Sequence, residues 1–392
     1  MMAAGYAAEG GARVTLFEKN PFLGKKLNIT GKGRCNITND CDVQQMLENV
    51  PQNSRFLYAA FSKLTAKQLI EFFEKNGLPV KTERGGRVFP VSDKAADVTA
   101  ALKRFAIGRG VQIKYDTVLD ITAGEGVRRV VTSKGEIDCD SVIIATGGLS
   151  YPLTGSTGDG YRFAQKLGHE IVPTRPSLVP LETVETFVAE LAGLALKNVR
   201  LEVFENGKRI FEDFGELLFT HFGVSGPLIL SASAHMRDFG KVYTIAIDLK
   251  PALEEKTLND RILRDFELFK NKDLPNGLVK LLPSSMIDVV VERLGVDSGT
   301  KINEITKETR RKLVQLLKKF TLTIKSPCHI DQAVITSGGV QVKQVDPKTM
   351  KSKLVPGLYF AGEVLDVDAY TGGFNLHIAF ATGALAGQSA GM

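Results

Sequence analysis

Three short apolar segments, far apart along the chain, each run into an acid or into glycine. Residues 14–18 end at Glu18, residues 142–148 end in Ala-Thr-Gly-Gly, and residues 357–363 read Gly-Leu-Tyr-Phe-Ala-Gly-Glu. Near-continuous apolar runs that stop at a glycine turn are typical of central strands in a parallel sheet. One such segment alone is common. The three in this order predict an α/β fold in which both chain ends build one domain.

The N-terminal residues have the pattern of half a βαβ unit. Residues 2–11 are rich in alanine and end in two glycines, which predicts a short helix, and residues 12–18 predict a strand. In a dinucleotide-binding unit, the acid that binds the ribose lies about 20 residues after the glycine fingerprint. Counting back from Glu18 passes the first residue, so we expect the first strand and its Gly-x-Gly-x-x-Gly loop to be missing. An Ala-rich capping helix followed by a solvated acid is the alternative.

The middle of the chain differs in pattern from its ends. Short strands dominate from about residue 173, and Asn206-Gly207 has the composition of a hairpin turn. Residues 255–319 are charged and predict helices, and strands return after about residue 327. We therefore expect a nucleotide-binding domain in residues 1–172 and 327–392. Between them we expect a β-rich module in residues 173–254 and about 320–326, and a helical insert in residues 255–319.

Composition and cysteine spacing exclude several classes of protein. The chain has 50 Lys and Arg against 44 Asp and Glu, and the net charge of +6 suits an anionic ligand as well as nucleic acid. Four cysteines without a Cys-x-x-Cys pair argue against a zinc ribbon, a dithiol pair and a disulfide framework, which favours a reducing cytoplasm. No metal-ligand spacing occurs, so we expect no metal. No apolar run reaches about 18 residues, so we expect no membrane span.

Three motifs are the most specific pieces of the sequence: residues 27–36 (LNITGKGRCN), residues 219–227 (FTHFGVSGP) and residues 371–375 (TGGFN). With them the chain resembles the flavoproteins that have two dinucleotide-binding domains. Among these it resembles bacterial FAD-dependent oxidoreductases of the aminoacetone-oxidase-like and bile-acid dehydro-reductase-like kind, over nearly its whole length. The resemblance implies a Rossmann-like FAD-binding domain with an inserted β-barrel-like module and a small helical subdomain. That family opens with a strand and a Gly-rich turn just before the position of Met1.

The resemblance also implies which residues hold FAD. Glu18 would bind the adenosine ribose, and the backbone of Val118 would meet the adenine edge. A helix beginning near Gly373 would aim its free N–H groups and positive dipole end at the isoalloxazine ring. The full set of cofactor contacts that we expect is Glu18, Lys19, Lys25, Gly31, Arg34, Cys35, Asn36, Val118, Thr146, Gly147, Gly148, Gly362, Glu363, Asp366, Gly373, Phe374, Asn375 and Leu376.

The catalytic acid or base is not identifiable from the sequence. Candidates are His377, Tyr370 and Cys35, because each lies in a motif that would face the flavin. A packed, hydrogen-bonded histidine and a buried inert thiol are the structural alternatives for His377 and Cys35. No second intact Gly-x-Gly-x-x-Gly occurs, so NAD(P)H would dock only transiently.

These features predict an FAD-dependent oxidoreductase that transfers hydride between flavin and a small organic substrate, such as a conjugated ketone, with NAD(P)(H) or oxygen as the other partner. One alternative is a flavin-dependent RNA-modifying enzyme, motivated by the net charge and the basic residues 301–319. Because a solvated helix face explains that segment, we do not expect nucleic acid as a partner. A non-catalytic flavin-binding protein and a truncated, cofactor-free remnant are further alternatives.

Overall fold

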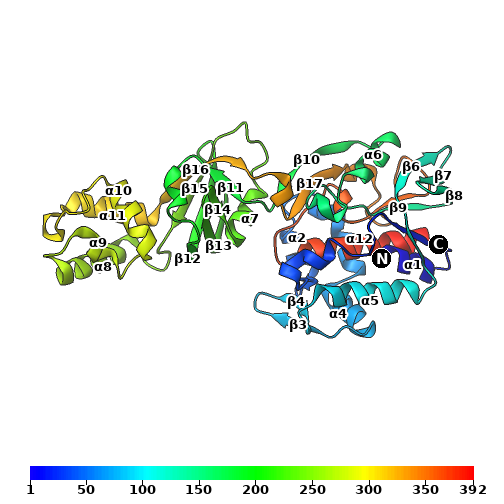
Figure 1. The fold of residues 1–392 in the computed structure, drawn as a ribbon, viewed down its shortest axis with the longest axis horizontal. Helices are drawn as coiled ribbons and strands as arrows, with labels where there is room; N and C mark the ends of the chain where they lie inside the picture. Colours follow the sequence, from blue (N-terminus) through cyan, green and yellow to red (C-terminus); the bar gives the residue numbers. More distant parts are fainter. The chain divides into compact units, whose positions relative to one another are not determined.

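The computed structural model describes residues 1–392 and divides them into two compact units, each with its own hydrophobic core. The first unit comprises Met1–Ser177 and His329–Met392, and the second comprises Leu178–Cys328 (Figure 1). The first mixes helices with parallel and antiparallel strands, and the second contains a closed barrel. The predicted α/β class with an inserted barrel module is confirmed.

Parallel strand pairs in the first unit join distant parts of the chain. β1 (Thr15–Glu18) pairs with β5 (Gln112–Tyr115), and β9 (Val142–Ile144) pairs with β18 (Leu358–Phe360). All three residues of β18 are buried, as expected of an apolar parallel strand. The second pair brings the glycine turn after β9 beside the segment that follows β18.

Helix α1 (Met2–Glu9) packs closely on the last helix, α12 (Phe374–Ala390). A side chain on Gly387 would lie 2.3 Å from the carbonyl oxygen of Ala3, and one on Gly391 would lie 2.6 Å from that of Ala7. The small residues of both helices are therefore needed for this contact, which holds the two chain ends together (Figure 1).

The remaining elements of the first unit form layers around these strands. An antiparallel sheet has the order β2-β4-β3, a second has the order β6-β7-β8, and β10 pairs with β17. Their bounds are β2 Thr38–Asn39, β3 Val80–Glu83, β4 Arg87–Pro90, β6 Val118–Ala123, β7 Val127–Thr132, β8 Gly135–Asp138, β10 Ile171–Ser177 and β17 Ile335–Val340. The helices are α2 Val43–Glu48, α3 Tyr58–Lys63, α4 Ala66–Lys75, α5 Ala95–Ile107 and α6 Asp159–Lys166. Strand β10 continues past residue 172, where we expected the first segment of this domain to end.

The second unit contains a six-strand barrel of order β11-β14-β13-β12-β15-β16. Side chains from its helices belong to the same hydrophobic core as those of the barrel. The strands are β11 Leu181–Thr183, β12 Ala195–Glu205, β13 Lys208–Thr220, β14 Gly223–Ser225, β15 Tyr243–Asp248 and β16 Phe320–Pro327. The helices are α7 Pro227–Ser233, α8 Glu255–Phe269, α9 Leu274–Leu278, α10 Ser284–Leu294 and α11 Lys307–Lys318. Asn206 and Gly207 have φ of 47° and 83°, as the tight hairpin between β12 and β13 requires.

The basic helix α11 is amphipathic. Its apolar side chains Leu313, Val314 and Leu317 are buried in the core of the second unit, whereas most of its charged side chains are exposed. Lys318 is paired with Asp248 at 2.6 Å. This arrangement is typical of a solvated helix face. No helix of the protein is both long and apolar enough to cross a bilayer.

Candidate functional site

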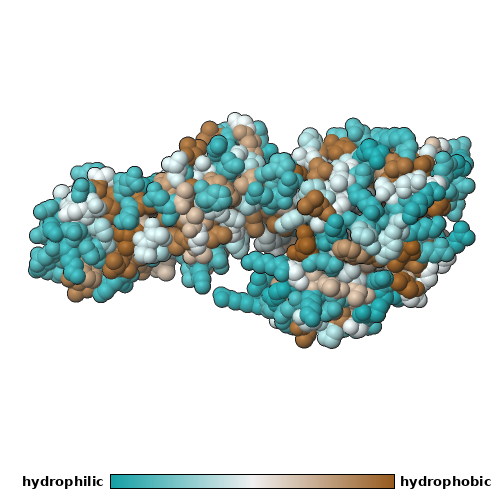
Figure 2. Space-filling model, viewed as in Figure 1, coloured by the Kyte–Doolittle hydropathy of each residue, from teal (hydrophilic) through white to brown (hydrophobic).

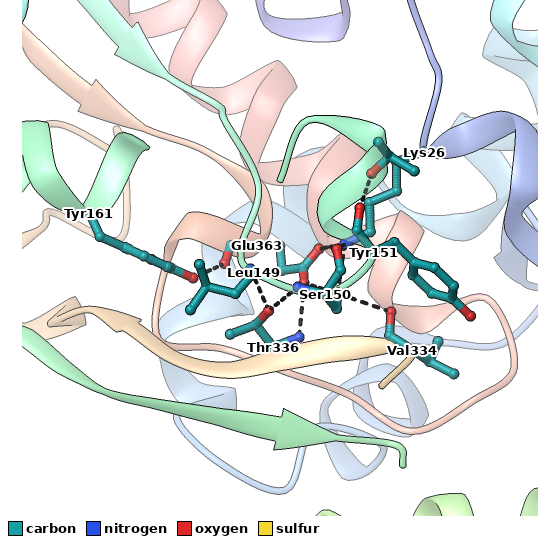
Figure 3. Close-up of polar contacts among 9 residues, drawn as sticks. Lys26, Leu149, Ser150, Tyr151, Tyr161, Val334, Thr336 and Glu363 are labelled. Carbon is teal, nitrogen blue, oxygen red and sulfur yellow. Dashed lines mark hydrogen bonds and ion pairs between the residues drawn. The ribbon is translucent and has the colours of Figure 1, made fainter. Parts of the chain in front are cut away.

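A polar network centred on Glu363 joins four segments of the first unit (Figure 3). One carboxylate oxygen of Glu363 accepts hydrogen bonds from the backbone N–H of Thr336 (2.8 Å) and from Ser150 Oγ (3.0 Å). The other oxygen lies 2.6 Å from Lys26 Nζ, which also donates to Ser150 Oγ (2.8 Å). The ion pair is largely shielded, with the side chains of Lys26 and Glu363 25% and 14% exposed, so the network fixes the segments around it.

The turn after β9 approaches this network as closely as a backbone can. A side chain on Gly148 would lie 2.4 Å from Thr336 Oγ1 and 2.9 Å from Glu363 Oε1, so only glycine fits. Thr336 Oγ1 accepts the N–H groups of Leu149 (2.8 Å) and Ser150 (3.0 Å). Gly147 has φ of 77°, and Thr146 lies against Gly160 of α6.

The N-terminus of α12 is presented by two glycines. Gly372 and Gly373 have φ of 126° and 101°, and a side chain on Gly373 would lie 2.5 Å from the carbonyl of Thr38. The first bond of the helix runs from His377 N to Gly373 O (3.1 Å), so the N–H groups of the preceding first turn have no helical acceptor. They form a positive helix end that is available to an anionic or carbonyl group.

Two side chains of that first turn, those of Phe374 and Asn375, make contacts within the protein. Asn375 clamps the preceding loop: its Oδ1 accepts from Ala369 N (2.8 Å) and its Nδ2 donates to Ala369 O (2.7 Å). Phe374 is buried and Leu376 is half-buried. The ring of Phe374 and the amide of Asn375 are therefore engaged within the protein, whereas the Leu376 side chain is partly exposed.

His377 lies in the interior and has both ring nitrogens occupied. Nδ1 is 2.7 Å from Thr38 Oγ1, and Nε2 is 2.8 Å from the carbonyl oxygen of Leu64, to which it donates. Burial lowers the pKa of His377 to about 4, so the ring is neutral at physiological pH. These contacts favour the packed histidine over the catalytic one. Tyr370, the neighbouring candidate, is half-buried and donates its N–H to Asn49 O (3.0 Å).

Two side chains of the glycine-rich loop of residues 24–36, those of Arg34 and Cys35, are engaged within the protein. Arg34 is paired with Glu83 (2.5 Å) and Asp93 (2.6 Å), which raise its pKa, and its guanidinium lies 4.1 Å from the ring centroid of Phe89. Cys35 is fully buried, and burial raises the pKa of its thiol to about 12. The thiol is therefore a poor nucleophile at neutral pH. Lys25 and Gly31 remain at the loop surface, half-buried and exposed respectively.

Glu18 and Lys19 lie at the carboxyl end of β1. Glu18 Oε1 accepts from the backbone N–H (2.8 Å) and the side-chain amide (2.7 Å) of Asn20. Lys19 is paired with Asp159 at 2.7 Å. Val118 begins β6, where it pairs with Thr132, so the structure places it in a different sheet from Glu18.

Asp366 lies in a buried polar cluster beyond the network of Glu363. It accepts from the amides of Gln52 (3.2 Å) and Asn53 (3.0 Å), and burial is the main cause of its raised pKa. Gly362, which precedes Glu363, has φ of 75° and donates its N–H to Thr382 Oγ1 (2.9 Å).

Sequence reasoning missed several polar residues of this region. Lys26, rather than Lys25, pairs with Glu363, and Ser150 and Thr336 complete that network. Asp368 is also buried and accepts from Ser177 Oγ (2.7 Å) and Ser337 Oγ (3.0 Å). The only sequence signal was their closeness to the glycine turns. No cluster of His, Cys, Asp or Glu can hold a metal ion.

The residues present fit a flavin. Asn36 Oδ1 is a buried acceptor with no donor in the protein, and the first turn of α12 offers free N–H donors. The pyrimidine edge of a flavin has both an N–H and carbonyl oxygens, so it complements these two kinds of group. The cofactor contacts expected of Asn36, of the α12 backbone and of Glu18 remain predictions.

The fold and these residues define a Rossmann-type flavoprotein of the oxidoreductase class. The chain belongs to the family described as HI0933-like protein Rossmann domain, whose profile matches residues 1–389.

Three relatives align over nearly the whole chain. A 3-dehydro-bile acid delta(4,6)-reductase of Clostridium scindens is 30% identical, with 98% of this chain and 94% of that protein covered. Ribosomal RNA dihydrouridine synthases are 31% identical in Haemophilus influenzae (97% and 93% covered) and 29% identical in Escherichia coli (97% and 93%). Among solved structures, the open conformation of a flavocytochrome c3 fumarate reductase has 15% identity and a TM-score of 0.47, with 100% of this chain and 76% of that chain covered.

Proposed function

We propose that this protein uses FAD to reduce a carbon–carbon double bond that is conjugated with a carbonyl group. The observation that carries the proposal is the chemistry shared by relatives with different substrates. A delta(4,6)-reductase of a 3-dehydro-bile acid and a dihydrouridine synthase are both named for reducing such a bond, and both align with at least 97% of this chain. The ring of a steroid ketone and the uracil base are chemically unrelated except for this conjugated system.

The bound flavin would supply the hydride, and solvent water would supply the proton that completes reduction of the double bond. The chain's own residues would orient and charge the site. The first-turn N–H groups of α12 would stabilise negative charge on a bound flavin, and His377, which is neutral, would add no charge of its own. The Glu363 network holds the β9 turn, and with it Gly147 and Gly148, at a fixed distance from the β18 segment. NADPH or NADH, docking transiently, would donate the two electrons.

The first candidate substrate is a small conjugated ketone, and the second is a uracil base within RNA. The RNA candidate is favoured by two relatives named as ribosomal RNA dihydrouridine synthases and by a net charge of +6. A positively charged protein attracts RNA, which is a polyanion, more strongly than it attracts a small substrate with one negative charge.

The test uses the FAD-loaded protein, reduced chemically under anaerobic conditions. A 4-en-3-one steroid or ribosomal RNA that lacks dihydrouridine is added, and return of the visible flavin band measures oxidation of the flavin. Mass spectrometry checks that the acceptor gains two hydrogens. Reoxidation by either acceptor supports the proposal and names the substrate class. Bound FAD that neither acceptor reoxidises would contradict it and favour a non-catalytic flavin-binding protein.

A further inference from the structure

The hairpin between β3 and β4 carries positive charge that nothing in the protein neutralises. Its turn is Arg84-Gly85-Gly86, and Arg87 follows; both arginines are exposed and neither has a carboxylate partner. The nearby cations Arg34 and Lys81, by contrast, are paired with Glu83 and Asp93. Figure 2 shows hydrophilic side chains over this tip. Glu83 and the nearby Asp93 are thus already paired, which leaves Arg84 and Arg87 without a carboxylate partner.

A third unpaired cation, Lys32, lies on the adjoining loop. Phe89 of β4 connects the loop to the hairpin: Arg34 lies 4.1 Å from its ring centroid, Arg87 lies 5.9 Å away, and a side chain on Gly31 would meet the ring at 3.6 Å. Lys32 is exposed and is held at φ of 57°, a left-handed conformation rare for lysine. Residues in such conformations persist only where the surrounding structure fixes them, and they cluster at functional sites.

The side chain of Asn39 connects the hairpin tip to the glycine turn that precedes α12. Asn39 Nδ2 donates to Gly85 O (2.9 Å) and to Gly372 O (3.3 Å). A side chain on Gly86 would lie 2.4 Å from Asn39 Oδ1, so the tip packs directly on this amide. The cationic tip therefore borders the place where the flavin edge and the bond to be reduced would lie.

We propose that Arg84, Arg87 and Lys32 form a cationic rim that binds backbone phosphates of an RNA strand whose base enters the site. The inference rests on the proposed function in its RNA form. Several unpaired cations at one rim can each bind a successive phosphate of an RNA backbone, whereas a small substrate with a single carboxylate would need only one cation. Gly85 and Gly86, at φ of 78° and 72°, also let the tip approach a backbone closely.

The test compares two double variants of the FAD-loaded protein that lose the same charge. Arg84→Gln with Arg87→Gln removes the rim, and Lys348→Gln with Lys351→Gln removes two exposed lysines of another turn in the same unit. Binding of a fluorescent, uridine-containing single-stranded RNA is measured by anisotropy at several salt concentrations. Because each phosphate contact contributes about 0.7 to the slope of log Kd against log salt, the rim variant should lose about 1.4 of that slope. Lys32→Gln should lose about 0.7, and the control should match the wild type.

Three results would overturn the proposal: an unchanged slope in the rim variant, an equal loss in the control, or a loss of bound FAD, which would assign the rim to the cofactor. The proposed function fails separately. A wild-type protein that reduces the steroid but does not bind RNA refutes the rim alone. One that binds RNA through the rim but reduces neither acceptor supports the rim and refutes the proposed function.

Discussion

Acidification should destabilise the first unit through His377. The ring is buried, accepts from Thr38 and donates to the carbonyl of Leu64, so it fits its surroundings only as the neutral form. Burial lowers its pKa from 6.5 to about 4. The unfolded chain therefore takes up this proton first, near pH 6.5, and the folded protein resists it until about pH 4. The stability that neutral His377 contributes is present above pH 6.5 and is lost as the pH falls between these values.

The expected size of the loss follows from the two pKa values. One pKa unit corresponds to about 1.4 kcal/mol. The full window from 6.5 to about 4 thus represents about 3 kcal/mol, of which about 2 kcal/mol should be lost between pH 7 and pH 5. His377→Gln removes the titrating group, so its stability should fall less over the same interval, even if the variant is less stable throughout.

The assay is urea unfolding at pH 7, 6 and 5, followed by circular dichroism. The two units can unfold separately, and the transition that His377→Gln displaces identifies the unit that contains it. His329→Gln is the control, because His329 is exposed and contacts only Asp331 nearby. If His377→Gln loses as much stability between pH 7 and pH 5 as the wild type, the buried neutral ring is not the cause and this reasoning is wrong.

Three further changes probe the site. Glu363→Gln keeps the acceptor oxygen but leaves Lys26 unpaired, so it should cost about 2–4 kcal/mol of unfolding free energy, and adding Lys26→Met should recover part of it in a double-mutant cycle. Gly373→Ala places a methyl group 2.5 Å from the Thr38 carbonyl at a φ of 101°, so it should cost at least about 1–3 kcal/mol and reduce FAD content, read from the visible spectrum. Cys35 should resist iodoacetamide in the folded protein, and Cys35→Ala should keep the wild-type rate of flavin reoxidation by substrate; rapid labelling would contradict the buried thiol.

Hydrophobic pattern and glycine were enough to predict the architecture. The apolar strands that run into Glu18 and into the turn at Gly147, the β-rich module and the Asn206-Gly207 hairpin follow from local sequence, because strand burial and left-handed turns restrict the residue types at those positions. That the module closes into a barrel was implied only by the family resemblance. The start of a helix near Gly373 was implied by the resemblance, and only the structure shows the close approach to Thr38 that favours glycine there.

The direction of polar side chains could not be predicted in this way. Lys25 and Lys26 are equivalent in sequence, and only the path of the loop turns Lys26 toward Glu363, more than 300 residues away in the chain. Arg34 was expected to contact the cofactor, and the sequence did not show that its guanidinium pairs with Glu83 and Asp93. Asn375 looked like a cofactor ligand, but its amide holds the loop before it. Such long-range partners depend on tertiary packing, which periodicity does not encode.

The way the second unit is inserted explains how a site built from both chain ends remains intact. In the first unit, the strands that flank the insertion, β10 and β17, pair with each other, Ser177 opposite Ile335. In the second unit, the entering and leaving chains also meet, because Cys328 N donates to Pro180 O (2.9 Å) and β11 pairs with β16. In each unit the two chain segments at the insertion point are therefore held together. For this reason the entropy cost of bringing Lys26 to Glu363 is not that of closing a flexible loop of more than 300 residues. The network around Glu363 should consequently form with the first unit even when the second is destabilised.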